Sequence, residues 1–306
     1  MTILFIFLQL LLFIALAPFF SGLITKIKNN FRMRKGPGVL QPYHNLAKLF
    51  SKGETVSETS SWIFKTAPFV VMASSLTAAL LIPVFILSSP LRGMSDFIAL
   101  IFIFSLGRFF LSLAALDTGS SFSGMGSSRE MFISSLVEPV VCLAVFALFL
   151  QFGSTDISAS SGLHGQSVSS LIVACALFLI TLAETSRVPV DNQETHLELT
   201  MVHEAMTLEY SGRSLALIEM SSYIKQMIWF FLIAQIVFPI NKPEFLNLSQ
   251  TSFWILWYLT RLILIAITVA VVEISLAKMR LFRVVDFLGF ALVLSIIGAI
   301  CAVLGV

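Results

Sequence analysis

The sequence predicts an all-α membrane protein with about eight transmembrane helices, both chain ends outward and large cytoplasmic loops 1 and 5. Three observations lead to this prediction. Of the 306 residues, 57% are hydrophobic and only 12% are charged, about half the charged fraction of a soluble domain. Apolar runs of bilayer-spanning length recur along the chain, and Lys and Arg gather in alternate connections between them. We expect one polytopic membrane domain over 1–306, because no stretch resembles a separate soluble domain.

Eight apolar runs are predicted to cross the bilayer. A helix needs about 20 apolar residues to span it, and lipid offers no partner to an unpaired backbone group, so each run must be helical. The first run is expected to be an uncleaved helix, because no basic residue precedes it and the first one is Lys26. The predicted spans are 3–24, 66–88, 97–116, 132–151, 168–185, 215–239, 253–275 and 285–305.

The distribution of basic residues predicts the orientation. The odd-numbered connections hold fourteen Lys and Arg residues, eight of them in 25–65, whereas the even-numbered connections hold only Arg92 and Lys242. Cytoplasmic loops of membrane proteins carry such an excess of positive charge. We therefore expect the basic loop 25–65 and the acidic loop 186–214 to be cytoplasmic, in a multi-pass protein of the inner (cytoplasmic) membrane.

The sequence also argues against several kinds of site. Cys142, Cys175 and Cys301 lie far apart in apolar runs, where we expect structural burial, and no C-x-x-C pair occurs. An iron–sulfur or zinc site needs clustered ligands, so no metal, cofactor or catalytic residue is predicted in this chain. Basic residues do not alternate with aromatic ones on a polar surface, so no nucleic-acid partner is expected.

Several charged residues fall inside the predicted spans, where each costs about 2.5–3.5 kcal/mol. Glu219 and Lys225 are six positions apart and project from different sides of their helix, so each needs a partner on another span. Carboxylates outnumber the bases near them in depth, which favours protonation of some of them. A path for protons or other ions is favoured, with structural ion pairing as the alternative. The residues concerned are Arg108, Glu138, Glu184, Glu219, Lys225, Arg261 and Glu273.

The acidic loop is expected to contain a helix over 192–208. Pro189 favours a turn, and Asp191 with Glu194 forms a capping-box pattern at the helix start. Glu194, Glu198 and Glu209 would share one side of this helix and His196 and His203 the other. The two histidines are too far apart for one metal ion. We predict an acidic funnel that lines a cavity at the membrane surface, with a solvated charge run as the alternative.

Four blocks of this sequence resemble a known family. "AETSRVPVD" at 183–191, followed by "LEYSG" at 208–212, is similar to a loop of the respiratory complex I subunit 1 family. "RMRKGPGVLQPYHNLAKLFSKG" at 32–53 and "VEISLAKMRLFR" at 272–283 also resemble family segments. "GRFFLSLAALDTGSSFSGMGSSREMFISSLVEP" at 107–139 looks like the membrane subunit of group 4 nickel–iron hydrogenases, of the formate hydrogenlyase or hydrogenase-4 type. The blocks occur in the family's order and cover nearly the whole chain.

The resemblance implies roles for individual residues. Arg34 and Lys35 fall in the segment where soluble subunits of relatives dock, and Arg187 matches a residue of the loop. The carboxylates that match the family's ion path are Glu138, Glu184, Asp191, Glu198, Glu209 and Glu219, to which the intramembrane charges add Lys225 and Glu273.

The resemblance also implies a function. The chain is expected to be a non-catalytic anchor and coupling subunit of a redox-driven proton or sodium pump. Its expected partners are hydrophilic iron–sulfur and hydrogenase-large-like subunits, antiporter-like membrane subunits and the lipid bilayer. Iron–sulfur clusters and a nickel–iron centre would lie on those partners. One alternative is the quinone-chamber subunit of a complex I-type quinone oxidoreductase, in which quinone binds. A second alternative is a stand-alone ion channel or transporter.

Overall fold

The computed structural model describes residues 2–57, 60–82, 95–157, 167–191, 201–239 and 248–305, with side chains described from Ile6 and, in the last segment, from Leu256. These residues form helices and connecting turns, without strands. The helices are α1 (Thr2–Phe31), α2 (Gln41–Ser51), α3 (Trp62–Leu81), α4 (Phe97–Asp117), α5 (Ser121–Phe152), α6 (Val168–Glu184), α7 (His203–Thr207), α8 (Gly212–Val237), α9 (Leu248–Ser275) and α10 (Leu281–Leu304).

The predicted all-α membrane architecture is confirmed. Eight of these helices coincide with the eight predicted spans, and seven are long and apolar enough to cross a bilayer. The eighth, α6, is apolar throughout but has only 17 residues. Two helices extend furthest beyond the predicted spans: α1 continues to Phe31, and α5 begins at Ser121.

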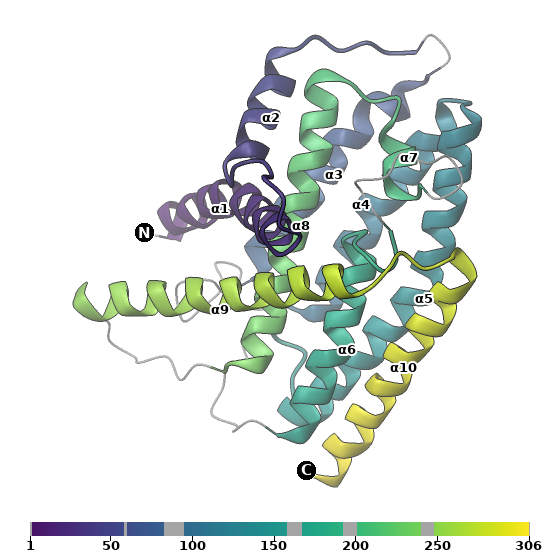
Figure 1. The fold of residues 1–306 in the computed structure, drawn as a ribbon. Coiled ribbons are helices and arrows are strands. Elements are labelled where there is room, and N and C mark those ends of the chain that lie inside the picture. The colour runs from purple at the N-terminus through teal and green to yellow at the C-terminus, as the bar shows by residue number, and fades with distance from the viewer. Residues whose placement is uncertain are drawn as a thin grey trace.

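Helix α8 lies at the centre of the fold. It packs against α1, α2, α3, α6 and α9, and every residue from Gln226 to Ile236 is buried. A helix that is apolar on all sides is expected in the interior of a bundle. Figure 1 shows α9 crossing the direction of α5 and α6, with α10 lying along α5 and α6.

The odd-numbered connections meet at one end of the bundle. Ser61 donates from its backbone N–H and its hydroxyl to Asp117 at 2.7 and 2.8 Å, and Thr55 donates its backbone N–H to Ser211 at 2.9 Å. At the other end, the Ile157 N–H donates to the Ser95 carbonyl at 2.9 Å. The spans therefore alternate in direction, as predicted. Which end faces the cytoplasm remains a prediction of the charge distribution.

Two short helices lie among the connections. Helix α2, within the basic loop, is amphipathic, buries Leu46 and packs against α1 and α8; the sequence did not predict it. Helix α7 coincides with the C-terminal part of the expected helix over 192–208, but the expected helix is interrupted, because Met201 and Val202 are not helical. Residues 192–200 lie outside the described residues.

The expected burial of the cysteines is wrong for two of them. Cys142 and Cys175 are exposed on the chain's surface, and Cys301 is half-buried. Their apolar sequence context reflects a surface that faces lipid or other membrane helices, since the outer face of a membrane helix is as apolar as its inner face.

Candidate functional site

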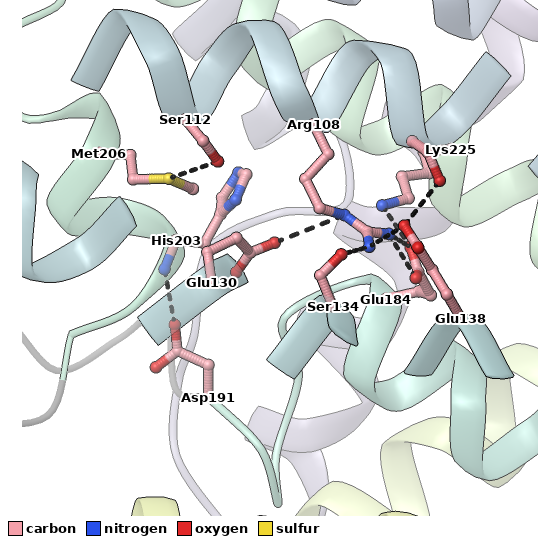
Figure 2. A network of polar contacts seen from close by, with 11 residues as sticks. Arg108, Ser112, Glu130, Ser134, Glu138, Glu184, Asp191, His203, Met206 and Lys225 are labelled. Carbon is pink, nitrogen blue, oxygen red and sulfur yellow. Dashed lines mark hydrogen bonds and ion pairs between the residues drawn. The ribbon is translucent and has the colours of Figure 1, made fainter. Parts of the chain in front are cut away.

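Four helices bring five charged side chains together inside the bundle (Figure 2). Arg108 on α4 donates to both carboxylate oxygens of Glu184, the last residue of α6. The ammonium group of Lys225 on α8 lies 2.6 Å from Glu184. Glu130 and Glu138 on α5 complete this charge cluster at 4.0 and 3.7 Å from the Arg108 guanidinium. Three carboxylates therefore share two cations.

Small residues allow the helices to approach closely around this cluster. Gly107 precedes Arg108, and a Cβ at this position would lie 2.4 Å from the Ser74 hydroxyl of α3. Ser134, one turn after Glu130 on α5, accepts a hydrogen bond from Arg108. Small residues at helix interfaces are typical of membrane proteins, where they let backbones pack closely. This packing places the Arg108 guanidinium among the three acids.

Burial makes the pairing within the cluster obligatory. The side chains of Arg108 and Glu184 are only 8% and 4% exposed. Removing one partner of a buried ion pair costs about 3–5 kcal/mol, because it leaves an uncompensated charge. Glu138 differs, because its side chain is 45% exposed on the outer surface of the bundle and accepts a hydrogen bond of 2.8 Å from Ser105. The cluster thus connects the interior of the chain with its lateral face.

A second group of charges lies where α9 meets the loop that follows α6. Glu273 is bound by Lys28 of α1 at 2.8 Å and by Arg187 at 2.7 Å. Arg187 also donates to the Gln226 side chain at 2.8 Å. These contacts connect α1, α8 and α9 to the loop. They pair Glu273 with two basic residues, Lys28 and Arg187, that the sequence placed in cytoplasmic connections.

Asp191 is the centre of a third contact. One of its oxygens binds Lys278 at 2.7 Å, and the other accepts the backbone N–H of His203 at 3.2 Å. Asp191 therefore joins the loop to the start of α7 and to the connection between α9 and α10. The expected capping of a helix that begins directly after Asp191 falls on residues 192–200, which lie outside the described residues.

One cavity is lined by the charge cluster, and two further cavities adjoin it. The cluster cavity offers about 60 Å³ to the centres of water molecules and is lined by Arg108, Glu130, Glu184, His203 and Lys225. This volume has room for several water molecules. The α7–α8 cavity, of about 340 Å³, is lined by residues that include Glu204, Leu208 and Glu219. The α1–α9 cavity, also about 340 Å³, is lined by residues that include Lys28, Asn45, Arg187, Asp191 and Glu273.

The cavities adjoin one another through shared lining residues. His203, Ile218 and Ser222 line both the cluster cavity and the α7–α8 cavity. Ser186 lines both the cluster cavity and the α1–α9 cavity. The α7–α8 cavity reaches the surface beside Leu208, which is exposed. Adjoining cavities therefore lie between the end of the bundle, where the odd-numbered connections meet, and the buried charges.

His203 is held between these charges and the α7–α8 cavity. Burial lowers the pKa of its imidazole, and the positive charges of Lys225 and Arg108 act in the same direction. The carboxylates of Glu130 and Asp191 oppose the shift without reversing it. The ring is therefore neutral near pH 7 and can accept a proton.

Comparison with known proteins identifies the family. The family model described as NADH dehydrogenase matches residues 2–304. The chain belongs to this family. It is 34% identical to hydrogenase-4 component C of Escherichia coli over 93% of this chain and 91% of that protein. It is 30% identical to formate hydrogenlyase subunit 4 of the same organism over 92% of each chain. It is also 27% identical to NADH-quinone oxidoreductase subunit 8 of Rhodothermus marinus over 67% of this chain and 62% of that protein.

A solved structure confirms the fold of this NADH dehydrogenase family member. The membrane-bound sulfane sulfur reductase, an archaeal respiratory membrane complex, contains a chain that superimposes with a TM-score of 0.83. The match covers 97% of this chain and 99% of that chain at 19% identity, so it supports the fold alone. The protein is thus a multi-pass membrane subunit related to those of hydrogenase-4, formate hydrogenlyase and complex I.

The structure brings together some of the residues that the sequence singled out and separates others. Glu138, Glu184 and Lys225 meet in the charge cluster, whereas Glu273 pairs with Arg187 beside the α1–α9 cavity. Glu219 lines the α7–α8 cavity. Three other predicted residues are exposed: Glu209, Arg34 and Lys35. Glu198 lies outside the described residues. The expected excess of carboxylates holds for the cluster as a whole but not for Glu184, which contacts two cations.

Sequence reasoning did not predict a role for Glu130, and it did not predict the basic partners of Glu273 and Asp191. Glu130 was assigned to a connection, because the Ser- and Gly-rich stretch before it did not resemble a span. The stretch is helical, and Glu130 lies two turns before Glu138 on α5. The partners Lys28 and Lys278 come from distant segments, and no local spacing in the sequence indicates those pairs.

Proposed function

We propose that this chain is the anchor and coupling subunit of a multisubunit redox-driven proton or sodium pump. In this role it catalyses no redox step itself. It holds a hydrophilic hydrogenase-like arm at the membrane and carries buried carboxylates of the ion path. The single observation that carries the proposal is the series of adjoining cavities and charged groups from the α7–α8 cavity, through the charge cluster, to Glu138.

The order of groups along this series suits ion transfer. Glu219 and Glu204 line the first cavity, Glu184 lies in the cluster, and Glu138 reaches the lateral surface. Waters in the cluster cavity can bridge charged groups that do not touch. A charge or conformational change at the loop around Asp191 would alter the field on these acids, which couples the redox event to their protonation. The lateral position of Glu138 suits transfer to an antiporter-like membrane subunit.

The basic loop supplies the proposed docking surface. Arg34 and Lys35 are exposed beyond the end of α1, at the end of the bundle where the loop around Asp191 lies. A positive surface steers a partner with complementary charge. We assign to this partner the iron–sulfur clusters and the nickel–iron centre, in a complex of the inner (cytoplasmic) membrane. Relatives named hydrogenase-4 component C and formate hydrogenlyase subunit 4 favour such an arm.

A quinone chamber is the second candidate, favoured by the α1–α9 cavity. Its volume of about 340 Å³ and its polar lining between α1, α2 and α9 suit the head of a quinone. Some relatives are named NADH-quinone oxidoreductase subunits. Quinone that copurifies with the complex, or inhibition by quinone-site ligands that an Arg187→Gln variant abolishes, would select this candidate over hydrogenase coupling.

The proposal is tested by separating ion transport from electron transfer in the assembled complex. We expect Glu138→Gln and Glu219→Gln to lower the number of ions pumped per electron by about tenfold, with electron transfer preserved. Asp286→Asn, which neutralises an exposed acid on α10, is the matched control and should pump normally. Unchanged pumping in both glutamine variants would remove these residues from the path.

A further inference from the structure

We propose that His203 is the proton relay between the α7–α8 cavity and the buried charge cluster. The proposal rests on the proposed function and adds the group through which protons enter the cluster. It concerns the junction of two cavities, where three residues form the shared wall: His203, Ile218 and Ser222.

The chemistry of the shared wall singles out His203. Ile218 has no exchangeable side-chain proton. The Ser222 hydroxyl donates to the Glu219 backbone carbonyl at 2.8 Å, so its proton is engaged within α8. His203 has two ring nitrogens, one a donor and one an acceptor when the ring is neutral. It is therefore the residue of the three that can take a proton on one side and release one on the other.

Groups that can give or take a proton lie next to His203 in both cavities. Figure 2 shows its ring beside Glu130, between Arg108 and the Met206 side chain. On the far side, the same ring borders the cavity that Glu204 and Glu219 line. The hydrogen bond from its backbone N–H to Asp191, 3.2 Å long, fixes the start of α7 at this junction.

Every neighbouring element contributes a charge that acts on the ring. Arg108 of α4 and Lys225 of α8 disfavour the imidazolium, and Glu130 of α5 and Asp191 of the loop favour it. Glu204 of α7 itself and Glu219 and Tyr223 of α8 line the adjoining cavity. With burial added, the neutral ring is the resting state, and the imidazolium is a transient one.

The transfer balances within the residues present. One ring nitrogen takes a proton from a hydronium ion in the α7–α8 cavity, which leaves water, and the other releases its proton to the Glu130 carboxylate. One proton has then moved and the ring is neutral again, ready for a second transfer after the tautomers exchange. From Glu130, the water-sized space of the cluster cavity leads to Glu184.

The test uses His203→Gln in the complete complex reconstituted in vesicles. Glutamine keeps polar groups at the junction but cannot pass a proton through a ring. We expect protons pumped per electron to fall by about tenfold or more, with electron transfer retained. Asp286→Asn, which neutralises an exposed acid on α10 away from both cavities, is the control that should pump as the parent does.

Chemical rescue distinguishes a relay from a structural role. In His203→Ala, added imidazole should restore pumping, and 4-methylimidazole should shift the pH profile of the restored pumping with its own basicity. Normal pumping by His203→Gln, or loss of pumping in His203→Ala without rescue, would overturn the relay. Should Glu138→Gln and Glu219→Gln abolish pumping while His203→Gln does not, the relay fails and the proposed function stands. A parent complex that pumps no ions would refute the proposed function itself.

Discussion

Glu184 shows how a single side chain can remain charged inside a membrane bundle. Its two oxygens contact Arg108 and Lys225, so the desolvation of one anion is offset by two cations. The ion pair is expected to stabilise the fold less than its geometry suggests, because all three groups lose their hydration. Such a pairing places a charged carboxylate beside Glu130 and Glu138, on the path that we propose for ions.

The pKa of His203 makes a prediction about stability and pH. An unfolded chain protonates this histidine near pH 6.5, whereas burial holds the pKa of the folded chain lower. The unfolded state therefore binds more protons as the pH falls through that value, and stability is lost on the acid side. We expect the thermal midpoint of the parent to fall between pH 7 and pH 5, and His203→Gln to lose part of this dependence.

Thermal unfolding in detergent measures the midpoint of the parent and of His203→Gln at each pH, and the difference between the two midpoints is compared across the pH range. His44→Gln serves as control, since His44 is exposed. Parallel stability–pH curves for the parent and His203→Gln would contradict the burial of a neutral ring.

At the scale of elements, the contact between α5 and α7 positions His203 against the cluster. Gly126 of α5 lies so close to α7 that an added Cβ would be 2.7 Å from the Ala205 Cβ and 3.0 Å from the Val202 carbonyl oxygen. Neither neighbour is a flexible chain end, so the backbone of α7 would have to move. Gly124, on the same helix, would meet only a Leu116 methyl group at 4.0 Å.

These two glycines give a matched pair of substitutions. Both gain helix propensity on replacement by alanine, by about 1 kcal/mol. We expect Gly124→Ala to be neutral or stabilising, and Gly126→Ala to destabilise by about 1–3 kcal/mol through overpacking. Hydrogen exchange of the amides of α7 should rise in Gly126→Ala alone. Equal stability and equal exchange in the two variants would contradict the close contact of α5 with α7.

The elements also show where sequence reasoning succeeds and fails. The eight spans were predictable, because each is an apolar run of bilayer length and Pro or charged residues mark many of their ends. The first turns of α5 were not, because Ser and Gly dominate them, although tertiary packing against α7 keeps them helical. Helix α2 was missed, since its few apolar residues are surrounded by a basic loop.

The same reasoning explains the outcome at the candidate site. Glu138, Glu184 and Lys225 were predictable as special, because charge in an apolar run is costly. The pairs that the charged residues form were not predictable, because contacts such as Lys28 with Glu273 and Asp191 with Lys278 join segments that only the fold brings together. The order of the groups along the cavities likewise depends on tertiary structure.

At the scale of the whole molecule, the orientation remains a prediction of the charge distribution. Lys52 and Asp156 are exposed at opposite ends of the bundle. In a background with serine at the three cysteine positions, we expect Lys52→Cys to react with an impermeant thiol reagent only from the cytoplasmic side. Asp156→Cys should react only from the opposite side. The reverse pattern would invert the molecule and place the α7–α8 cavity outside the cell.

The central claim is that acids of the membrane-spanning helices of this chain change protonation when the partner arm turns over. Redox-triggered infrared difference spectroscopy of the assembled complex in a bilayer measures such changes directly as carboxyl bands. We predict a band of a protonating or deprotonating carboxyl group that is lost in Glu138→Gln or Glu219→Gln and retained in Asp286→Asn. Difference spectra of both glutamine variants identical to that of the parent would contradict the claim and leave the chain as an anchor alone.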